Sequence, residues 1–136
     1  MDTAQAQEFL RTHHHAVLST FRKDGRPQLS PVVLALDAAG RVVLSTTETR
    51  AKCRNLRRDP RVSACVFTRP FFGPWTQVEG TAEILPPGDG FDAAALASLH
   101  GALGEEYGDW ESFRAGIHAD GRVAIRFGIE RASGPA

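Results

Sequence analysis

The chain has 136 residues, 42% of them hydrophobic and 24% charged, and these totals suit a single globular domain over residues 1–136. Sixteen basic residues balance sixteen acidic ones, so no overall positive field attracts the protein to nucleic acid or to an anionic membrane. No apolar run is long enough to span a bilayer, and the N-terminus lacks an apolar signal segment. Because Cys53 and Cys65 form no disulfide framework, we expect a cytoplasmic protein whose cysteines fill small spaces in the core.

The first third of the chain predicts a helix followed by three strands. A short helix is expected over residues 2–12, capped by Asp2 or Thr3. Apolar, β-branched runs predict strands over residues 16–22, 29–36 and 41–46. The dipeptide Asp24-Gly25 is a strong hairpin signal, so the first two strands should be antiparallel neighbours.

The rest of the chain alternates strands with helices. A helix is expected over residues 48–58, beginning at Thr47 or Thr49 and ending before Asp59-Pro60. Further strands are predicted over residues 61–69, 75–85 and 122–130, with helices over 91–107 and 109–118. Six short strands would leave exposed edges in an open sheet, so we predict a mainly β fold with helices, built on a six-stranded antiparallel barrel.

The segment from residue 45 to residue 61 concentrates positive charge in an otherwise neutral chain; it reads STTETRAKCRNLRRDPR. Six of the twelve residues from 50 to 61 are Lys or Arg. Because this charge is local, it suits a small anionic group better than a long polyanion. The free amides at the start of the predicted helix and the hydroxyl groups before it add hydrogen-bond donors, which together indicate a phosphate pocket.

Helical spacing divides this basic segment into two faces. The face that borders the core carries Leu56 together with Lys52 and Asn55. The opposite face carries four arginines, Arg50, Arg54, Arg57 and Arg58. In one interpretation, Lys52, Arg50 and the preceding hydroxyls form the phosphate pocket. In the other, Thr47 or Thr49 only caps the helix and the arginines are solvated, and the residues by themselves leave both interpretations open.

Three longer segments follow one another in a specific order. They read VLSTFRKDGRPQLSPV (17–32), VLSTTETRAKCRNLRRDPRVSACV (43–66) and VEGTAEI (78–84). Together they resemble the split-barrel flavin and deazaflavin oxidoreductases, the superfamily named after pyridoxamine 5'-phosphate oxidase, and most of all its branch that uses the deazaflavin coenzyme F420. The resemblance implies an FMN-binding type of split β-barrel and a homodimer, with the coenzyme in grooves between the protomers.

The resemblance also implies which residues bind the coenzyme. Its phosphate would lie at the start of the basic helix, against Thr46, Arg50, Ala51, Lys52 and Asn55. Its ring would lie along the second and third strands, beside Gln28, Ser30, Pro31, Val32 and Ser45. The partner protomer would contribute Trp75 and Gln77.

The expected activity is that of an F420-dependent oxidoreductase, which transfers a hydride to a small unsaturated organic substrate without a catalytic side chain. An FMN-dependent oxidase or reductase and a non-catalytic F420 carrier are the alternatives. The C-terminal arginines that grip a substrate phosphate in pyridoxamine phosphate oxidases have no counterpart in the ending GIERASGPA, which argues against that activity. A nucleic-acid binder is disfavoured, because the chain is neutral and residues 50–61 contain no aromatic side chain.

Two further groups of residues invite a functional interpretation. The three histidines His13–His15 lie in an extended segment, where successive side chains point to alternate faces, so we expect a polar junction rather than a metal site. Phe71 and Phe72 are expected to close the bottom of the barrel or to lie in the dimer interface. Trp75 is expected either there or in the wall of the substrate site.

Overall fold

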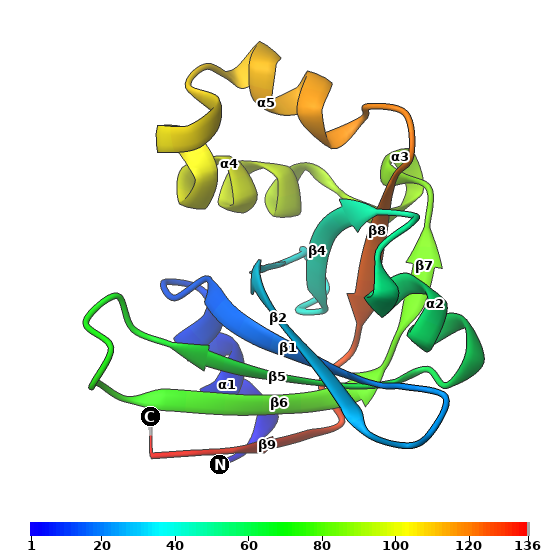
Figure 1. Ribbon diagram of the computed structural model, residues 1–136. Helices are drawn as coiled ribbons and strands as arrows, with labels where there is room; N and C mark the ends of the chain where they lie inside the picture. Colours follow the sequence, from blue (N-terminus) through cyan, green and yellow to red (C-terminus); the bar gives the residue numbers. More distant parts are fainter. Residues whose placement is uncertain (136) are drawn as a thin grey trace.

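The computed structural model describes residues 1–135, apart from the side chains of residues 104–107 (Figure 1). Two antiparallel sheets make up most of it. The five-stranded sheet has the order β2 (Pro27–Val33), β1 (His15–Phe21), β5 (Arg61–Phe67), β6 (Trp75–Thr81) and β9 (Arg131–Ser133). The four-stranded sheet has the order β3 (Ala35–Leu36), β4 (Val42–Thr47), β8 (Arg122–Phe127) and β7 (Glu83–Leu85).

The number of strands differs from the prediction, because the described residues form nine strands in two sheets and not six strands in one closed barrel. Two predicted strands are each broken where the chain passes from one sheet to the other, β2 to β3 at Leu34 and β6 to β7 at Ala82; the last predicted strand ends early, at Phe127, and β9 lies beyond its predicted range. The amide of Leu34 donates to the carbonyl of His14, and the amide of Ala82 donates to the carbonyl of Pro60. The backbone amides at these two breaks therefore keep hydrogen-bond partners although the strands are interrupted.

Five helices accompany the sheets in the described part of the chain: α1 (Thr3–Leu10), α2 (Ala51–Arg58), α3 (Pro87–Gly90), α4 (Ala93–Tyr107) and α5 (Trp110–Ile117). Asp2 caps α1, since its carboxylate accepts from the Gln5 amide at 2.8 Å. The start of α2 differs from the prediction. Arg50 occupies the N-cap position with no side-chain cap, because residues 48–50 form a turn, so neither Thr47 nor Thr49 caps the helix.

Two clusters of buried side chains make up the core. The larger one lies between the two sheets and includes Leu18, Val66, Leu44 and Phe127, with Leu10 of α1 among them. The smaller cluster lies on the other side of the four-stranded sheet, where α4 and α5 cover it. The four-stranded sheet is thus covered on both faces, whereas the outer face of the five-stranded sheet has no helix layer over it (Figure 1).

The two cysteines lie in different environments. Cys53 is fully buried in the larger core, as predicted, but Cys65 is exposed on the outer face of the five-stranded sheet. The prediction for Cys65 was wrong because side chains alternate along β5: Ala64 and Val66 point into the core, so Cys65 between them points to the outer face. In the described part of the chain, no helix has both the length and the apolar character needed to cross a membrane.

Candidate functional site

A cavity of about 390 Å³ lies where the two sheets, the start of α2 and the helix layer meet. Its polar wall comes from the end of β4, from α2 and from the start of β8, and its apolar wall comes from β2, α4 and α5. The residues that line it are Ser30, Pro31, Val32, Val33, Ser45, Thr46, Thr47, Arg50, Lys52, Leu99, Leu103, Ile117 and Arg122. The cavity therefore combines cationic and hydroxyl groups at one side with an apolar surface at the other.

Three of these residues, Arg50, Lys52 and Arg122, form what we term the cation cluster. Arg122 donates to the hydroxyl of Ser45 through Nε at 3.2 Å and Nη2 at 2.8 Å. None of the ion pairs among the described residues involves a member of the cluster. Burial lowers the pKa of Lys52, and the charges of Arg50 and Arg122 lower it further. An anion placed here would relieve that repulsion and gain three positively charged neighbours.

The other cations of the basic segment, which we term the outer arginines, all have protein partners. Arg54 donates to the Thr49 carbonyl at 2.6 Å, and Arg58 donates to the Phe21 carbonyl at 2.8 Å. Two more form ion pairs, Arg57 with Glu48 and Arg61 with Asp59. Their charge is therefore partly compensated within the fold, in contrast to the cation cluster.

Hydroxyl and amide groups complete the polar wall. The Ser30 hydroxyl is buried without a hydrogen-bond partner among the described residues, which is costly unless a ligand supplies one. Ser45 accepts from Arg122 and keeps its own hydrogen to donate. The first amides of α2 have no partner within the helix, because an α-helix leaves its first N–H groups free. This wall thus presents donors of several kinds to one anionic group.

The structure brings together seven of the twelve residues that the sequence indicates for the coenzyme. Those that line the cavity are Ser30, Pro31, Val32, Ser45, Thr46, Arg50 and Lys52. Those outside its lining are Gln28, Ala51, Asn55, Trp75 and Gln77. Asn55 is buried and its amide donates to the Thr20 hydroxyl at 3.1 Å, which ties α2 to β1. Trp75 and Gln77 lie on β6 in the outer face of the five-stranded sheet.

Sequence reasoning missed the third cation of the cluster, Arg122. Alternation along the last strand indicates correctly that Arg122 points away from the main core. However, that side of the four-stranded sheet is the floor of the cavity, because Arg122 pairs with Thr47 directly across β8 and β4. The pairing of β4 with β8 would have revealed it, but this register joins segments about 75 residues apart and no local pattern encodes it.

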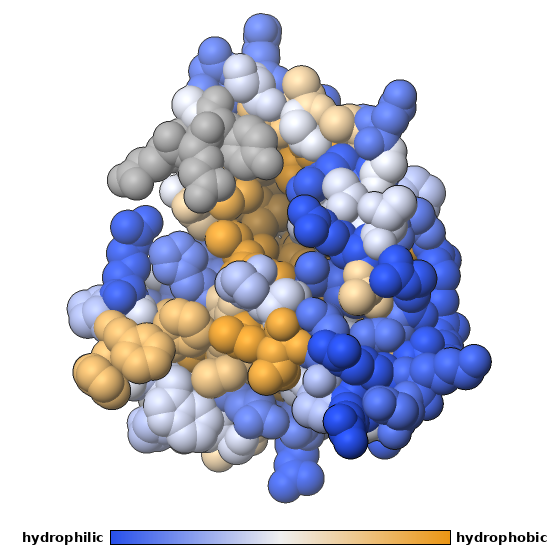
Figure 2. All heavy atoms as spheres, in the orientation of Figure 1, coloured by the Kyte–Doolittle hydropathy of each residue, from blue (hydrophilic) through white to orange (hydrophobic). Residues whose placement is uncertain are grey.

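The outer face of the five-stranded sheet carries several exposed apolar side chains. Leu29 is 60% exposed, Phe71 72%, Phe72 96% and Trp75 41%. Figure 2 shows apolar side chains along the front of this sheet, from the β5–β6 loop towards β2. The prediction that Phe71 and Phe72 close the bottom of the barrel is wrong, because their loop projects beyond the sheet and away from the core.

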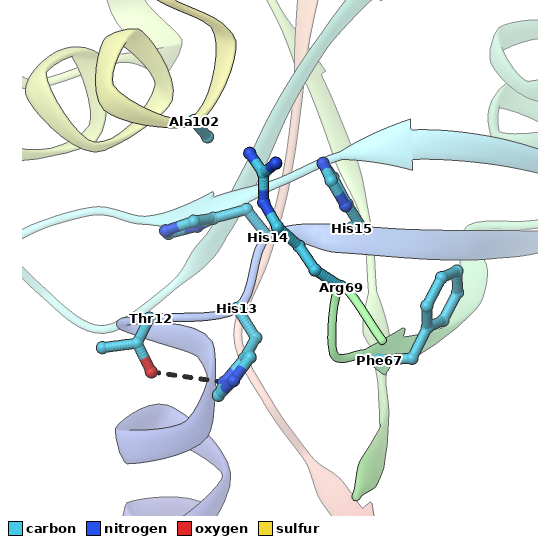
Figure 3. A pocket seen from close by; sticks show the side chains of 7 residues that line it. All are labelled: Thr12, His13, His14, His15, Phe67, Arg69 and Ala102. Carbon is cyan, nitrogen blue, oxygen red and sulfur yellow. Dashed lines mark hydrogen bonds between the residues drawn. The ribbon is translucent and has the colours of Figure 1, made fainter. Parts of the chain in front are cut away.

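The three histidines lie at the junction of α1 and β1. His13 stacks on Phe9 with ring centroids 4.2 Å apart, and all three histidines line a small cavity with Arg69 (Figure 3). Burial lowers the pKa of His14, whose Nδ1 lies 3.0 Å from the Leu34 carbonyl oxygen. Within the part of the chain that the structure describes, no three His, Cys, Asp or Glu side chains are placed to hold one metal ion.

Solved structures share this fold over nearly the whole chain. A conserved hypothetical protein from Mycobacterium tuberculosis is 26% identical, with a TM-score of 0.71 over 98% of this chain and 84% of its own. An F420 reductase is 22% identical, with a TM-score of 0.66 over 93% of this chain and 94% of its own. A heme storage protein from Vibrio cholerae is 17% identical, with a TM-score of 0.68 over 96% of this chain and 92% of its own.

These likenesses establish the fold, and they span proteins described as binding different ligands. A family model is more specific than the individual structures. The family sequence model described as pyridoxamine 5'-phosphate oxidase matches residues 2–134 of this chain. The chain therefore belongs to the pyridoxamine 5'-phosphate oxidase family of split-barrel proteins, a superfamily whose solved members include an F420 reductase.

Proposed function

We propose that this chain is an F420-dependent oxidoreductase that reduces a small unsaturated organic substrate. The observation that carries this proposal is the cation cluster, in which Arg50, Lys52 and Arg122 lie without carboxylate partners around one cavity. Within a family of coenzyme-binding barrels, such a cluster is suited to the anionic arm of a coenzyme. The F420 reductase among the solved structures with this fold adds support for the deazaflavin.

The residues present fit such a group in both chemistry and position. Phosphate oxygens would accept from Lys52, from the start of α2 and from the hydroxyls of Ser45 and Thr46. The unpartnered Ser30 hydroxyl lies further along β2, where a ring would place its own polar edge. Pro31 and Val32 offer an apolar surface beneath that ring. The cavity thus provides a cationic end for the phosphate and an apolar end for the ring, in the order that a phosphate-bearing ring requires.

Once bound, the coenzyme would supply the hydride chemistry, and the residues of the chain would position it and exclude water. The cation cluster would fix the anionic arm, so that the ring cannot slide along β2. Leu99 and Leu103 of α4 and Ile117 of α5 form the apolar roof, which would keep water from the ring. No acid or base of the chain is required, because solvent can provide the proton to the product.

We propose further that a second copy of the chain covers the outer face of the five-stranded sheet. This face is apolar and has no helix layer, and Leu29, Phe71, Phe72 and Trp75 are exposed on it. Trp75 and Gln77 lie there and not in the cavity of their own chain, so they could reach a coenzyme only in the partner's groove. The homodimer would then have its coenzymes between the protomers.

A titration of the protein with F420, FMN and hemin tests the proposal. We expect F420 to bind with a saturable change in its fluorescence and to compete with FMN for one site. Tighter binding of FMN would assign the protein to the flavin branch instead. Preferential binding of hemin, the ligand class of the heme storage protein with this fold, would overturn both assignments. Turnover of reduced F420 with a panel of enones and quinones then separates an enzyme from a carrier.

A further inference from the structure

The cavity at the cation cluster is one end of a longer groove. A second cavity of about 360 Å³ shares Pro31, Val32 and Val33 with it. That second cavity in turn shares His15 and Phe67 with the small cavity at the histidines. The three cavities therefore adjoin one another in sequence, from Lys52 at one end to His14, His15 and Arg69 at the other.

The middle of the groove is a flat apolar shelf. Val33, His15 and Phe67 form one row across β2, β1 and β5, because His15 pairs with both of the others in the antiparallel ladders. Their side chains point to the outer face of the sheet, which also carries Trp75, so in the proposed homodimer the partner would form the opposite wall of this shelf. Figure 2 shows apolar atoms in the hollow between this sheet and α4. A shelf of this shape suits a planar, unsaturated or aromatic body lying flat on the strands.

The far end of the groove offers a positive charge without a protein partner. Arg69 is exposed, and it takes part in no ion pair or side-chain hydrogen bond within the described part of the chain. In Figure 3 its guanidinium points into the cavity between His14 and His15, beneath Ala102 of α4. His14 donates from Nδ1 to the Leu34 carbonyl, so the neutral ring can only accept at Nε2, and the charge that this end presents comes from Arg69.

We propose that Arg69 and His15 bind a carboxylate of the substrate, so that the substrate class is planar conjugated or aromatic acids. The small cavity, of about 50 Å³, has room for a carboxylate head group but not for a ring. Arg69 can hold both oxygens of a carboxylate, and the shelf holds the body to which it is attached. This inference rests on the proposed coenzyme site at Lys52, since it names the substrate of that same groove.

The test uses two probes of the same shape, 2-naphthoate and 2-naphthamide, and calorimetric binding to the full chain. Both are titrated into the coenzyme-loaded protein and into the free protein with inorganic phosphate saturating the cation cluster. We expect the acid to bind about tenfold more tightly than the amide, because only the acid forms charge-assisted hydrogen bonds. In Arg69→Gln the two should bind equally, whereas Arg26→Gln, which removes an exposed arginine at the β1–β2 turn, should keep the preference.

Equal binding of acid and amide to the wild-type chain would overturn the inference, as would an acid preference that survives Arg69→Gln. A preference that is instead lost in Lys52→Ala would place the acid in the cation cluster and would also overturn it. The proposed function fails by a separate result: F420 does not bind the wild-type chain, or FMN or hemin binds it more tightly. The two failures are distinguishable because the ratio of acid to amide affinity is also measured without coenzyme.

Discussion

The cation cluster and the outer arginines come from the same stretch of sequence, with Arg122 added, but the fold treats them differently. Each outer arginine contacts a carbonyl or a carboxylate, as Arg57 does with Glu48 and Arg61 with Asp59. Lys52 has cations for neighbours instead, and its pKa is lowered by burial and by those charges. An exposed arginine with a partner changes the stability of the folded protein little, whereas a partly buried lysine among like charges lowers that stability.

In a chain of zero net charge, the cations without protein partners indicate where an anionic ligand could bind. Counting charges along residues 50–61 treats Lys52 and Arg57 alike. Their partners separate them: Arg57 has a carboxylate beside it, whereas the partly buried Lys52 has neither a carboxylate nor full hydration, so a bound anion would stabilise its charge. We therefore propose that the cation cluster is the functional part of the basic segment, whereas the outer arginines bond to the fold itself.

The largest effect is expected from Lys52→Ala, which removes a half-buried charge that has no carboxylate partner. Coenzyme binding should weaken by about 1–3 kcal/mol, the scale of a lost charge-assisted hydrogen bond. Fluorescence titration of the variant against the wild-type chain measures this loss. Lys52→Met serves as the matched control, because it keeps the apolar stem and should lose as much; full affinity in either variant would contradict the role of the charge.

A smaller loss, of about 1–2 kcal/mol in coenzyme binding, is expected from Arg122→Gln. Arg122 would act both directly and through Ser45, whose hydroxyl it holds at 2.8 Å. The control is Arg126→Gln on the same strand, since Arg126 pairs with Glu83 outside the cavity. If both variants lose affinity equally, the effect comes from β8 as a whole and the cluster has only two members.

Arg122 also marks the limit of what the sequence could predict. Local patterns predicted the helices other than α3 and the strand segments other than β9, and helical spacing placed Lys52 at the border of the buried side of α2. Hydropathy could not show that two predicted strands each serve two sheets, because the sequence stays apolar through Leu34 and keeps alternating through Ala82. The site depends on those sheet pairings, so its second wall could not be predicted from local patterns.

The helix layer is the other part of the site that sequence reasoning missed. Leu99 and Ile117 have the spacing of an apolar helix face, which is correct for both α4 and α5. Spacing cannot say that the same residues also roof a cavity above β2. Conversely, the sequence resemblance predicts that Asn55 binds the coenzyme phosphate, but in the structure its side-chain amide donates a hydrogen bond to the Thr20 hydroxyl and so joins α2 to β1. Its effect on the site remains a prediction that only binding measurements with variants can test.

Coenzyme affinity at the cation cluster should depend on pH, because Lys52 titrates. Because its pKa is lowered in the free protein, a bound anion raises it, and binding takes up a proton at alkaline pH between the two values. Coenzyme affinity should therefore fall as pH rises through that window and be level below it. For the chain without coenzyme, the free energy of unfolding should rise as pH increases from the lowered pKa of folded Lys52 to its ordinary value in the unfolded chain. The reason is that the unfolded chain binds the Lys52 proton more tightly over this range. Calorimetry in buffers of different ionisation enthalpy measures the proton uptake, which Lys52→Ala should abolish.

The smallest effect is expected from Arg57→Ala, although Arg57 is as basic as Lys52 and lies five residues further along α2. Its guanidinium pairs with Glu48, and both side chains are about half exposed, so the pair contributes only about 0–1 kcal/mol to folding. Coenzyme affinity should change by less than about 0.5 kcal/mol, because Arg57 does not line the cavity at the cation cluster. A loss equal to that of Lys52→Ala, in the same fluorescence titration, would move the anion site to the outer face. It would also mean that a cation with a carboxylate partner, such as Arg57, contributes as much to coenzyme binding as Lys52, which has none.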